Sequence, residues 1–277
     1  MNKNNKPWLK IKNQSDTDAE LYISGDIVGD DVGGCIESWG ESGTGYNWPA
    51  DIKRQLDEVG DKNLTIYINS GGGSVMAGMA MANMVKRCKG QTTAVVDGYC
   101  CSIATQILFA ADKCQVPKNA YVMIHKPSTV AWGDSNDLQK CIEQLNTVQA
   151  GIESTYVDAA RDGVTPEQVH EMVENETWLT GEQAAEYFNV DVLDAVEVAA
   201  YAGDTKKLFK HTPDGLHFAD GPILFPENGE RKDRLNIDLN VNVNGLDKVK
   251  AAKAAEDKLN SQRAQIALAL AEEAMNV

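Results

Sequence analysis

Short apolar runs rich in β-branched residues alternate with amphipathic stretches through the first 200 residues of the chain. Alternation with a period of two predicts strands, and apolar residues three or four positions apart predict helices. The predicted strands cover 19–27, 63–70, 91–99, two pieces of 113–125 on either side of a Pro-Lys-Asn turn, and 191–198. The predicted helices cover 48–60, 75–88, an apolar stretch within 99–112, 135–163, 165–176 and 180–190, whereas the Gly- and Ser-rich stretch 33–47 is expected to be a loop. Repeated strand–turn–helix order of this kind predicts an α/β fold.

Several predicted helices have recognisable ends. Pro49 stands near the start of helix 48–60, and Ser135 or Asn136 is a plausible N-cap for the long amphipathic helix that begins there. These signals support the boundaries of the helices and leave their packing open.

The pattern changes after residue 200. Residues 211–234 are rich in turn formers, and 235–244 (LNIDLNVNVN) alternate strictly between apolar and Asn or Asp side chains. That alternation predicts one strand, and an Ala-, Lys- and Glu-rich helix is expected from about Leu246 to Met275. Because a lone strand is unstable in water, we expect 235–244 to pair with the body or with a neighbouring subunit, and the terminal helix to contact a partner. The expected organisation is an N-terminal segment 1–19, a domain 20–200, and a C-terminal extension 201–277.

Composition and charge narrow the function classes. The 277 residues carry a formal net charge of −15, almost all of it in the first 200 residues. Such an excess of acid disfavours binding to nucleic-acid phosphates or anionic membranes. The N-terminus lacks the apolar core of a signal peptide, and no run approaches the length of a membrane span, so the sequence predicts a soluble intracellular protein.

The six cysteines have no metal-ligand spacing and no CxxC pair. Cys100 and Cys101 are adjacent within an apolar stretch, so they are expected to be buried, reduced thiols that pack as small hydrophobic side chains. No metal or organic cofactor is expected.

Two turns lead from a strand into a helix and could present amide groups to a ligand. The first contains Gly71, Gly72, Gly73 and Ser74, and the second contains Ser102. Free N–H groups at such turns can bind a phosphate or a developing oxyanion. A phosphate-binding P-loop is disfavoured because no lysine follows the glycines.

A nucleophilic serine needs a base, and the first 200 residues contain two histidines. His170 lies among acidic neighbours in helix 165–176 and is expected to be a surface residue. His125 ends a strand just before Pro127, where catalytic groups are commonly displayed, although a lone histidine there can also be structural.

Four ordered segments resemble the motifs of the caseinolytic protease (ClpP) family. They are YINSGGGSVMAGMAMANMV, GYCCSIATQILFAAD, MIHKP and ETWLTGEQAAEYFNVDVLDAV, and the resemblance covers about residues 20–198. It implies a ClpP/crotonase-type fold of stacked strand–strand–helix units and a ring-forming serine hydrolase that acts on protein or peptide substrates.

The resemblance also implies residue roles. The nucleophile falls on Ser102, the base on His125 and the acid on Glu176, where the family usually has Asp. The oxyanion donors fall on the amides of Gly73 and Ile103. An extended peptide would lie as an added strand along the glycine turn, beside Gly71, Gly72 and Ser74.

Departures from the family pattern refine the expected partners. The proline that usually precedes the glycines is absent, and so is the N-terminal segment whose axial loops help dock a ring ATPase. An unfoldase partner is therefore not expected. The region of Trp39 and Trp48, the TWLTG segment and the long extension are more similar to ClpP-related head maturation proteases of tailed phages. That similarity implies work in the host cytoplasm or within a viral prohead, on a capsid or scaffold protein.

Three other readings remain open at this stage. A crotonase-type acyl-CoA enzyme would use the same amide donors without a Ser-His pair. A Ser-Lys hydrolase would use Lys126 as the base. A capsid or scaffold component could keep the fold without activity.

Overall fold

The computed structural model describes residues 11–12, 15–38, 45–195 and 209–211. Every described helix and strand belongs to one compact unit. Of the described residues, Thr129–Trp132 alone fall in a second unit. The strand predicted at 235–244 and the helix after it lie outside the described residues.

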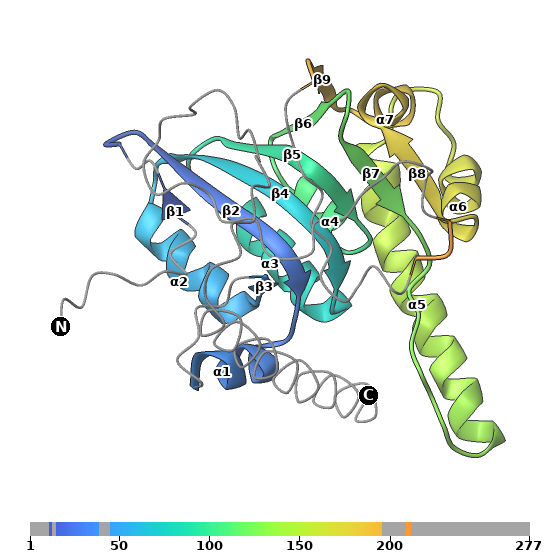
Figure 1. Cartoon of the computed structure of the whole chain (residues 1–277). Helices are drawn as coiled ribbons and strands as arrows, with labels where there is room; N and C mark the ends of the chain where they lie inside the picture. The colour runs from blue at the N-terminus through green and yellow to red at the C-terminus, as the bar shows by residue number, and fades with distance from the viewer. Residues whose placement is uncertain (1–10, 13–14, 39–44, 196–208, 212–277) are drawn as a thin grey trace, which may run out of the picture. The chain divides into compact units, whose positions relative to one another are not determined.

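A nine-stranded, mainly parallel sheet organises the unit (Figure 1). Its main path runs in the order β1-β2-β4-β5-β6-β9, β3 pairs with β2, and β7 lies beside β5 and carries β8 on its other side. β1 and β8 are antiparallel to their neighbours, and the other pairs are parallel. The strands are β1 (Ile11–Lys12), β2 (Asp18–Ile27), β3 (Tyr46–Asn47), β4 (Asn63–Gly73), β5 (Thr92–Cys101), β6 (Lys113–Pro117), β7 (Tyr121–Ile124), β8 (Thr177–Thr180) and β9 (Asp191–Leu193). The predicted α/β class is confirmed.

Helices connect the strands, and α2, α3 and α4 lie along one face of the sheet in Figure 1. The long helix α5 runs from beside β7 out past the sheet, and α6 and α7 lie near β8. The helices are α1 (Asp30–Ser38), α2 (Pro49–Val59), α3 (Val75–Lys86), α4 (Ala104–Leu108), α5 (Ser135–Ala159), α6 (Pro166–Glu174) and α7 (Gly181–Tyr187).

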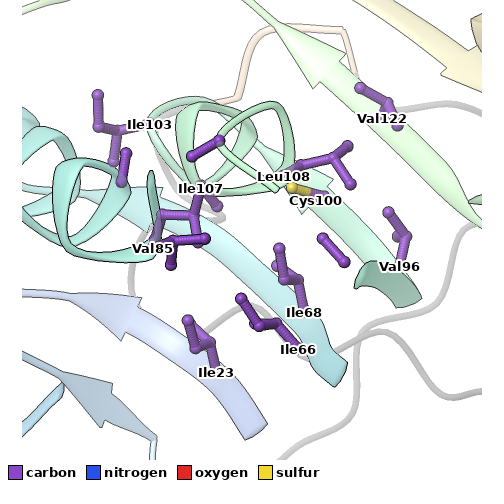
Figure 2. Packing of buried hydrophobic residues seen from close by; sticks show 14 of the residues in the cluster. Ile23, Ile66, Ile68, Val85, Val96, Cys100, Ile103, Ile107, Leu108 and Val122 are labelled. Atoms are coloured by element: carbon purple, nitrogen blue, oxygen red, sulfur yellow. The ribbon is translucent and has the colours of Figure 1, made fainter. Parts of the chain in front are cut away.

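The core lies between the sheet and these helices. Figure 2 shows Ile23, Ile66 and Ile68 on neighbouring strands, close to Val85 and Ile107 on α3 and α4. All five side chains are almost completely excluded from solvent. Burying one such side chain stabilises a fold by about 1.5–3 kcal/mol, so this layer holds the helices firmly against the strand ends that carry the site.

The segment predicted as a loop at 33–47 is helical in its first part. Helix α1 includes Gly33 and Gly34, which are weak helix formers. A Cβ on Gly33 would lie 2.3 Å from the indole of the buried Trp48, so the glycine lets the helix pack against that ring. The prediction failed because tertiary packing outweighs local propensity here.

Three other local predictions need correction. β5 continues through Cys101, and α4 is only five residues long, so the stretch 99–112 is a strand, a turn and a short helix. The N-cap of α5 is Asp134, one residue before the predicted candidates, and it forms a capping box with Asp137. Of the closing strand predicted over 191–198, Asp191–Leu193 form β9, residues 194–195 are not in a strand, and residues 196–198 lie outside the described residues.

Candidate active site

Ser102 follows the last residue of β5 and occupies a strained turn before α4. Its φ is +54°, which is uncommon for a residue other than glycine, and its amide donates to the carbonyl oxygen of Met123 on β7 at 2.8 Å. Among the described residues, Ser102 and Glu176 are the two non-glycine residues with positive φ. Strain of this kind clusters at functional sites, because the surrounding structure must support it.

The glycines of β4 let the backbone come very close to this serine. β4 runs straight through the predicted glycine turn and ends at Gly73, so this segment is strand and not an open loop. A Cβ on Gly72 would lie 2.7 Å from Cβ of Ser102, and a Cβ on Gly73 would lie 2.0 Å from the carbonyl oxygen of Ile27. Both positions have positive φ, so glycine is required for conformation and for space.

His125 comes directly after β7 and faces the serine. Its Nε2 lies 2.8 Å from Oγ of Ser102, within hydrogen-bond distance. Burial lowers the pKa of His125 below its ordinary value of 6.5; the negative charge of Glu176 raises it, and the positive charge of Lys210 lowers it. A neutral imidazole at neutral pH can accept the hydroxyl proton.

Glu176 comes directly before β8, on the strand that pairs with β7. Ile124 is opposite Thr177 in that antiparallel pair, so the same register extended by one residue brings His125 opposite Glu176. The side chain of Glu176 is buried, with 7% exposed. The ends of β5 and β7 and the start of β8 thus bring the three predicted triad residues to one place.

The Glu176 carboxylate has partners that the sequence did not indicate. Oε1 accepts hydrogen bonds from the backbone amides of Lys210 and His211, each at 2.7 Å. Oε2 is buried and has no hydrogen-bond partner among the described residues. Sequence reasoning missed this contact because any residue except proline can donate a backbone amide.

Of the two amides predicted as oxyanion donors, that of Ile103 lies close to Gly72 of β4. The nitrogen of Ile103 is 3.2 Å from the position that a Cβ on Gly72 would occupy. On either side of Gly73 the amides are engaged: Gly72 donates to Oγ of Ser70, and Ser74 donates to the carbonyl oxygen of Ile27. The Ser74 amide is therefore engaged within the fold. The roles of Gly73 and Ile103 as donors, and of Gly71, Gly72 and Ser74 in substrate binding, remain predictions.

The competing residues have other partners. Nζ of Lys126 forms an ion pair with Glu174 at 2.9 Å, which disfavours it as the base of a Ser-Lys hydrolase. His170 is exposed and its Nδ1 lies 3.0 Å from Glu153, as expected for a surface histidine. Asp191, the acidic residue that begins β9, is exposed there and pairs with Gln115 of β6, so it does not compete with the buried Glu176.

Cys100 and Cys101 are fully buried, as predicted, and none of the six cysteines forms a disulfide bond. Burial raises the pKa of both thiols, so they stay protonated and pack as apolar groups. Within the described part of the chain there is no cluster of three or more His, Cys, Asp or Glu side chains suited to a metal ion. The described helices also include none that is long and apolar enough to cross a membrane.

Comparison with known proteins agrees with this geometry. The family model described as Clp protease matches residues 55–194. The ATP-dependent Clp protease proteolytic subunit 1 of Streptomyces avermitilis is 31% identical over 131 residues, which are 47% of this chain and 59% of that protein. Proteolytic subunit 3 of Streptomyces coelicolor is 29% identical over the same shares of the two chains.

Proteolytic subunit 2 of Tropheryma whipplei is 30% identical over 132 residues, which cover 47% of this chain and 72% of that protein. The matches to the two Streptomyces proteins cover 59% of each, which is less than two thirds of their length. The family model matches half of this chain and includes the segments that carry Ser102, His125 and Glu176. The chain belongs to the Clp protease family.

Proposed function

We propose that this protein is a serine endopeptidase that uses Ser102 as nucleophile, His125 as general base and Glu176 as the acid that orients the histidine. The observation that carries the proposal is the 2.8 Å contact between His125 Nε2 and Ser102 Oγ at a strained strand end. The names of the relatives, proteolytic subunits of ATP-dependent proteases, support peptide hydrolysis as the activity.

The mechanism is acyl transfer. His125 accepts the hydroxyl proton while Oγ of Ser102 attacks the peptide carbonyl carbon, and the amides of Gly73 and Ile103 stabilise the negative oxygen of the tetrahedral intermediate. The imidazolium then protonates the leaving amine as the C–N bond breaks. Water, deprotonated by His125, hydrolyses the acyl-enzyme and restores Ser102. Each oxyanion donor contributes about 3 kcal/mol to stabilisation of the transition state.

Reaction with a fluorophosphonate tests the proposal. The full-length protein should be labelled at Ser102, because the probe phosphonylates serines that a neighbouring base activates, with loss of fluoride. Mass spectrometry of the digested product locates the label. A crotonase-type acyl-CoA enzyme has no activated serine, so an unlabelled protein with intact fold would favour that alternative, or a component that keeps the fold without activity.

We further propose that the protein works as a homo-oligomeric ring. The first half of α5 extends past the sheet in Figure 1, and its apolar residues Leu138 and Ile142 are 41% and 51% exposed. Contact with the same helix of a second copy would remove both from water. Light scattering should therefore give a mass that is a multiple of the chain mass, and a fully active monomer at micromolar concentration would contradict the proposal.

The proposed biological setting is head maturation in a tailed phage, in the host cytoplasm or within a prohead, with a capsid or scaffold protein as substrate. The support is the sequence of the TWLTG segment, which includes Trp178 and β8, together with the long extension after residue 200. No unfoldase, nucleic acid, membrane or cofactor has a role in this proposal.

A further inference from the structure

Glu176 is held in a conformation that needs support from other parts of the chain. Its carboxylate is buried, and its backbone has a φ of +48°. A buried carboxylate is stable only when hydrogen bonds or charges compensate for lost water. The residues that follow it in β8 pair with β7 through their backbone and do not supply hydrogen-bond donors to the carboxylate.

The compensation comes from a segment more than thirty residues further along the chain. Oε1 of Glu176 accepts two short hydrogen bonds from consecutive amides, those of Lys210 and His211. Hydrogen bonds to an ionised acceptor are stronger than neutral ones, and two of them fix the carboxylate plane. Oε2, which has no hydrogen-bond partner among the described residues, is then the oxygen available to accept a hydrogen bond from the imidazole of His125.

Phe209 anchors this segment to the protease body. Its ring packs edge-on against Trp178 of β8, with ring centroids 5.3 Å apart and an interplanar angle of 86°. The same cluster includes the buried Tyr99, Cys101 and Met123, so the anchor rests on β5 and β7, the strands that carry the serine and the histidine. The side chains of Lys210 and His211 are exposed, which leaves their backbone amides as the contact with the site.

We propose that residues 209–211 form a positioning segment, in which the amides of Lys210 and His211 hold Glu176 so that its second oxygen orients His125. The inference rests on the proposed serine endopeptidase function. These residues lie beyond 55–194, the part that the family model matches, so the segment adds to the elements that the family model describes. Residues 209–211 thus complete the active site.

Proline substitution tests the role of the amides, because proline has no N–H. The variant Lys210→Pro loses one hydrogen bond to Glu176, and its matched control Lys210→Ala keeps that bond while losing the same side-chain charge. With a fluorophosphonate as probe, we expect Lys210→Pro to react roughly 10- to 100-fold more slowly than Lys210→Ala, the loss expected when a catalytic group is misplaced by about 1 Å. The two variants are compared with each other on the plateau of their pH profiles, where His125 is neutral and the shared loss of the Lys210 charge does not affect the comparison.

The pH profile of labelling separates positioning from a general loss of structure. The charge of Glu176 raises the pKa of His125, so a displaced carboxylate moves the lower limb of the profile to lower pH. The charge of Lys210 lowers that pKa, so Lys210→Ala moves the limb to higher pH. The lower limb of the Lys210→Pro profile should therefore lie at lower pH than that of Lys210→Ala. Glu176→Gln should move the limb in the same direction.

Two further pairs cover the case in which Lys210→Pro does not fold, as judged by circular dichroism. His211→Pro against His211→Ala repeats the comparison at the second amide. Phe209→Ala removes the aromatic anchor, and Phe209→Tyr keeps an aromatic ring at the same place. Phe209→Tyr should therefore label with fluorophosphonate at close to the wild-type rate, and Phe209→Ala more slowly. Equal rates and equal pH profiles within the folded pairs would overturn the positioning role.

The outcomes also separate this inference from the proposed function. If the wild-type protein is not labelled at all, the serine endopeptidase proposal fails. If the wild type is labelled and Glu176→Gln is roughly 10²- to 10⁴-fold slower, as when the acid of a triad is neutralised, the proposed acid stands. Proline variants that then match their alanine controls would refute the positioning segment alone.

Discussion

The variant Ser102→Ala is expected to lose peptidase activity by roughly 10⁴- to 10⁶-fold, which corresponds to about 5–8 kcal/mol of transition-state stabilisation. Alanine removes the oxygen that forms the acyl bond, and among the described residues Ser102 supplies the hydroxyl that is hydrogen-bonded to His125. The fold should survive, because Ser102 is partly exposed and the hydrogen bond from its backbone amide to the carbonyl oxygen of Met123 does not involve the side chain. Peptide hydrolysis and fluorophosphonate labelling measure the loss, and circular dichroism checks the fold.

His170→Ala is the matched control for histidine and nucleophile variants alike. His170 lies exposed on α6, and its partners are Glu153 on α5 and Glu174, neither of which belongs to the proposed triad. Its activity should be close to that of the wild type. A folded Ser102→Ala that keeps its activity, or an inactive His170→Ala, would place the nucleophile or the base elsewhere.

The second large effect is expected at His125. His125→Ala removes the base, so the serine hydroxyl keeps its proton at neutral pH and acylation slows by nearly as much as in Ser102→Ala. In the wild type, activity requires the neutral ring and therefore rises with pH through the pKa of His125. Because burial lowers that pKa, the midpoint of the rise should lie below pH 6.5.

Steady-state rates between pH 4.5 and 8.5, at about half-unit steps, measure this rise. A midpoint above 6.5 would mean that the charge of Glu176 outweighs burial at the ring. A residual rate in His125→Ala with the wild-type pH profile would show that another group acts as the base.

Much of the fold could be predicted because its elements follow from local patterns. The strand 63–70 and the helix after Ser74 were expected from their periodicity, and both are present as β4 and α3. The stretch around Gly33 was misread, because its helix depends on contact with Trp48, which is fifteen residues away. The length of β5 was underestimated for the same reason, since Cys101 belongs to the strand through its pairing with Met123 on β7.

The sequence by itself determined the α/β fold, the buried state of Cys100 and Cys101, and Ser102 and His125 as a candidate pair. These features follow from periodicity, from apolar context and from the kinds of side chain available for the chemistry. Tertiary structure decided the rest. Pairing within the sheet brings His125 to hydrogen-bond distance of Ser102. β4 passes so close to Ser102 that position 72 has room for glycine but not for a Cβ atom. The amides that hold Glu176 come from residues 209–211, and no pattern of side chains marks them, because every residue except proline carries the same backbone donor.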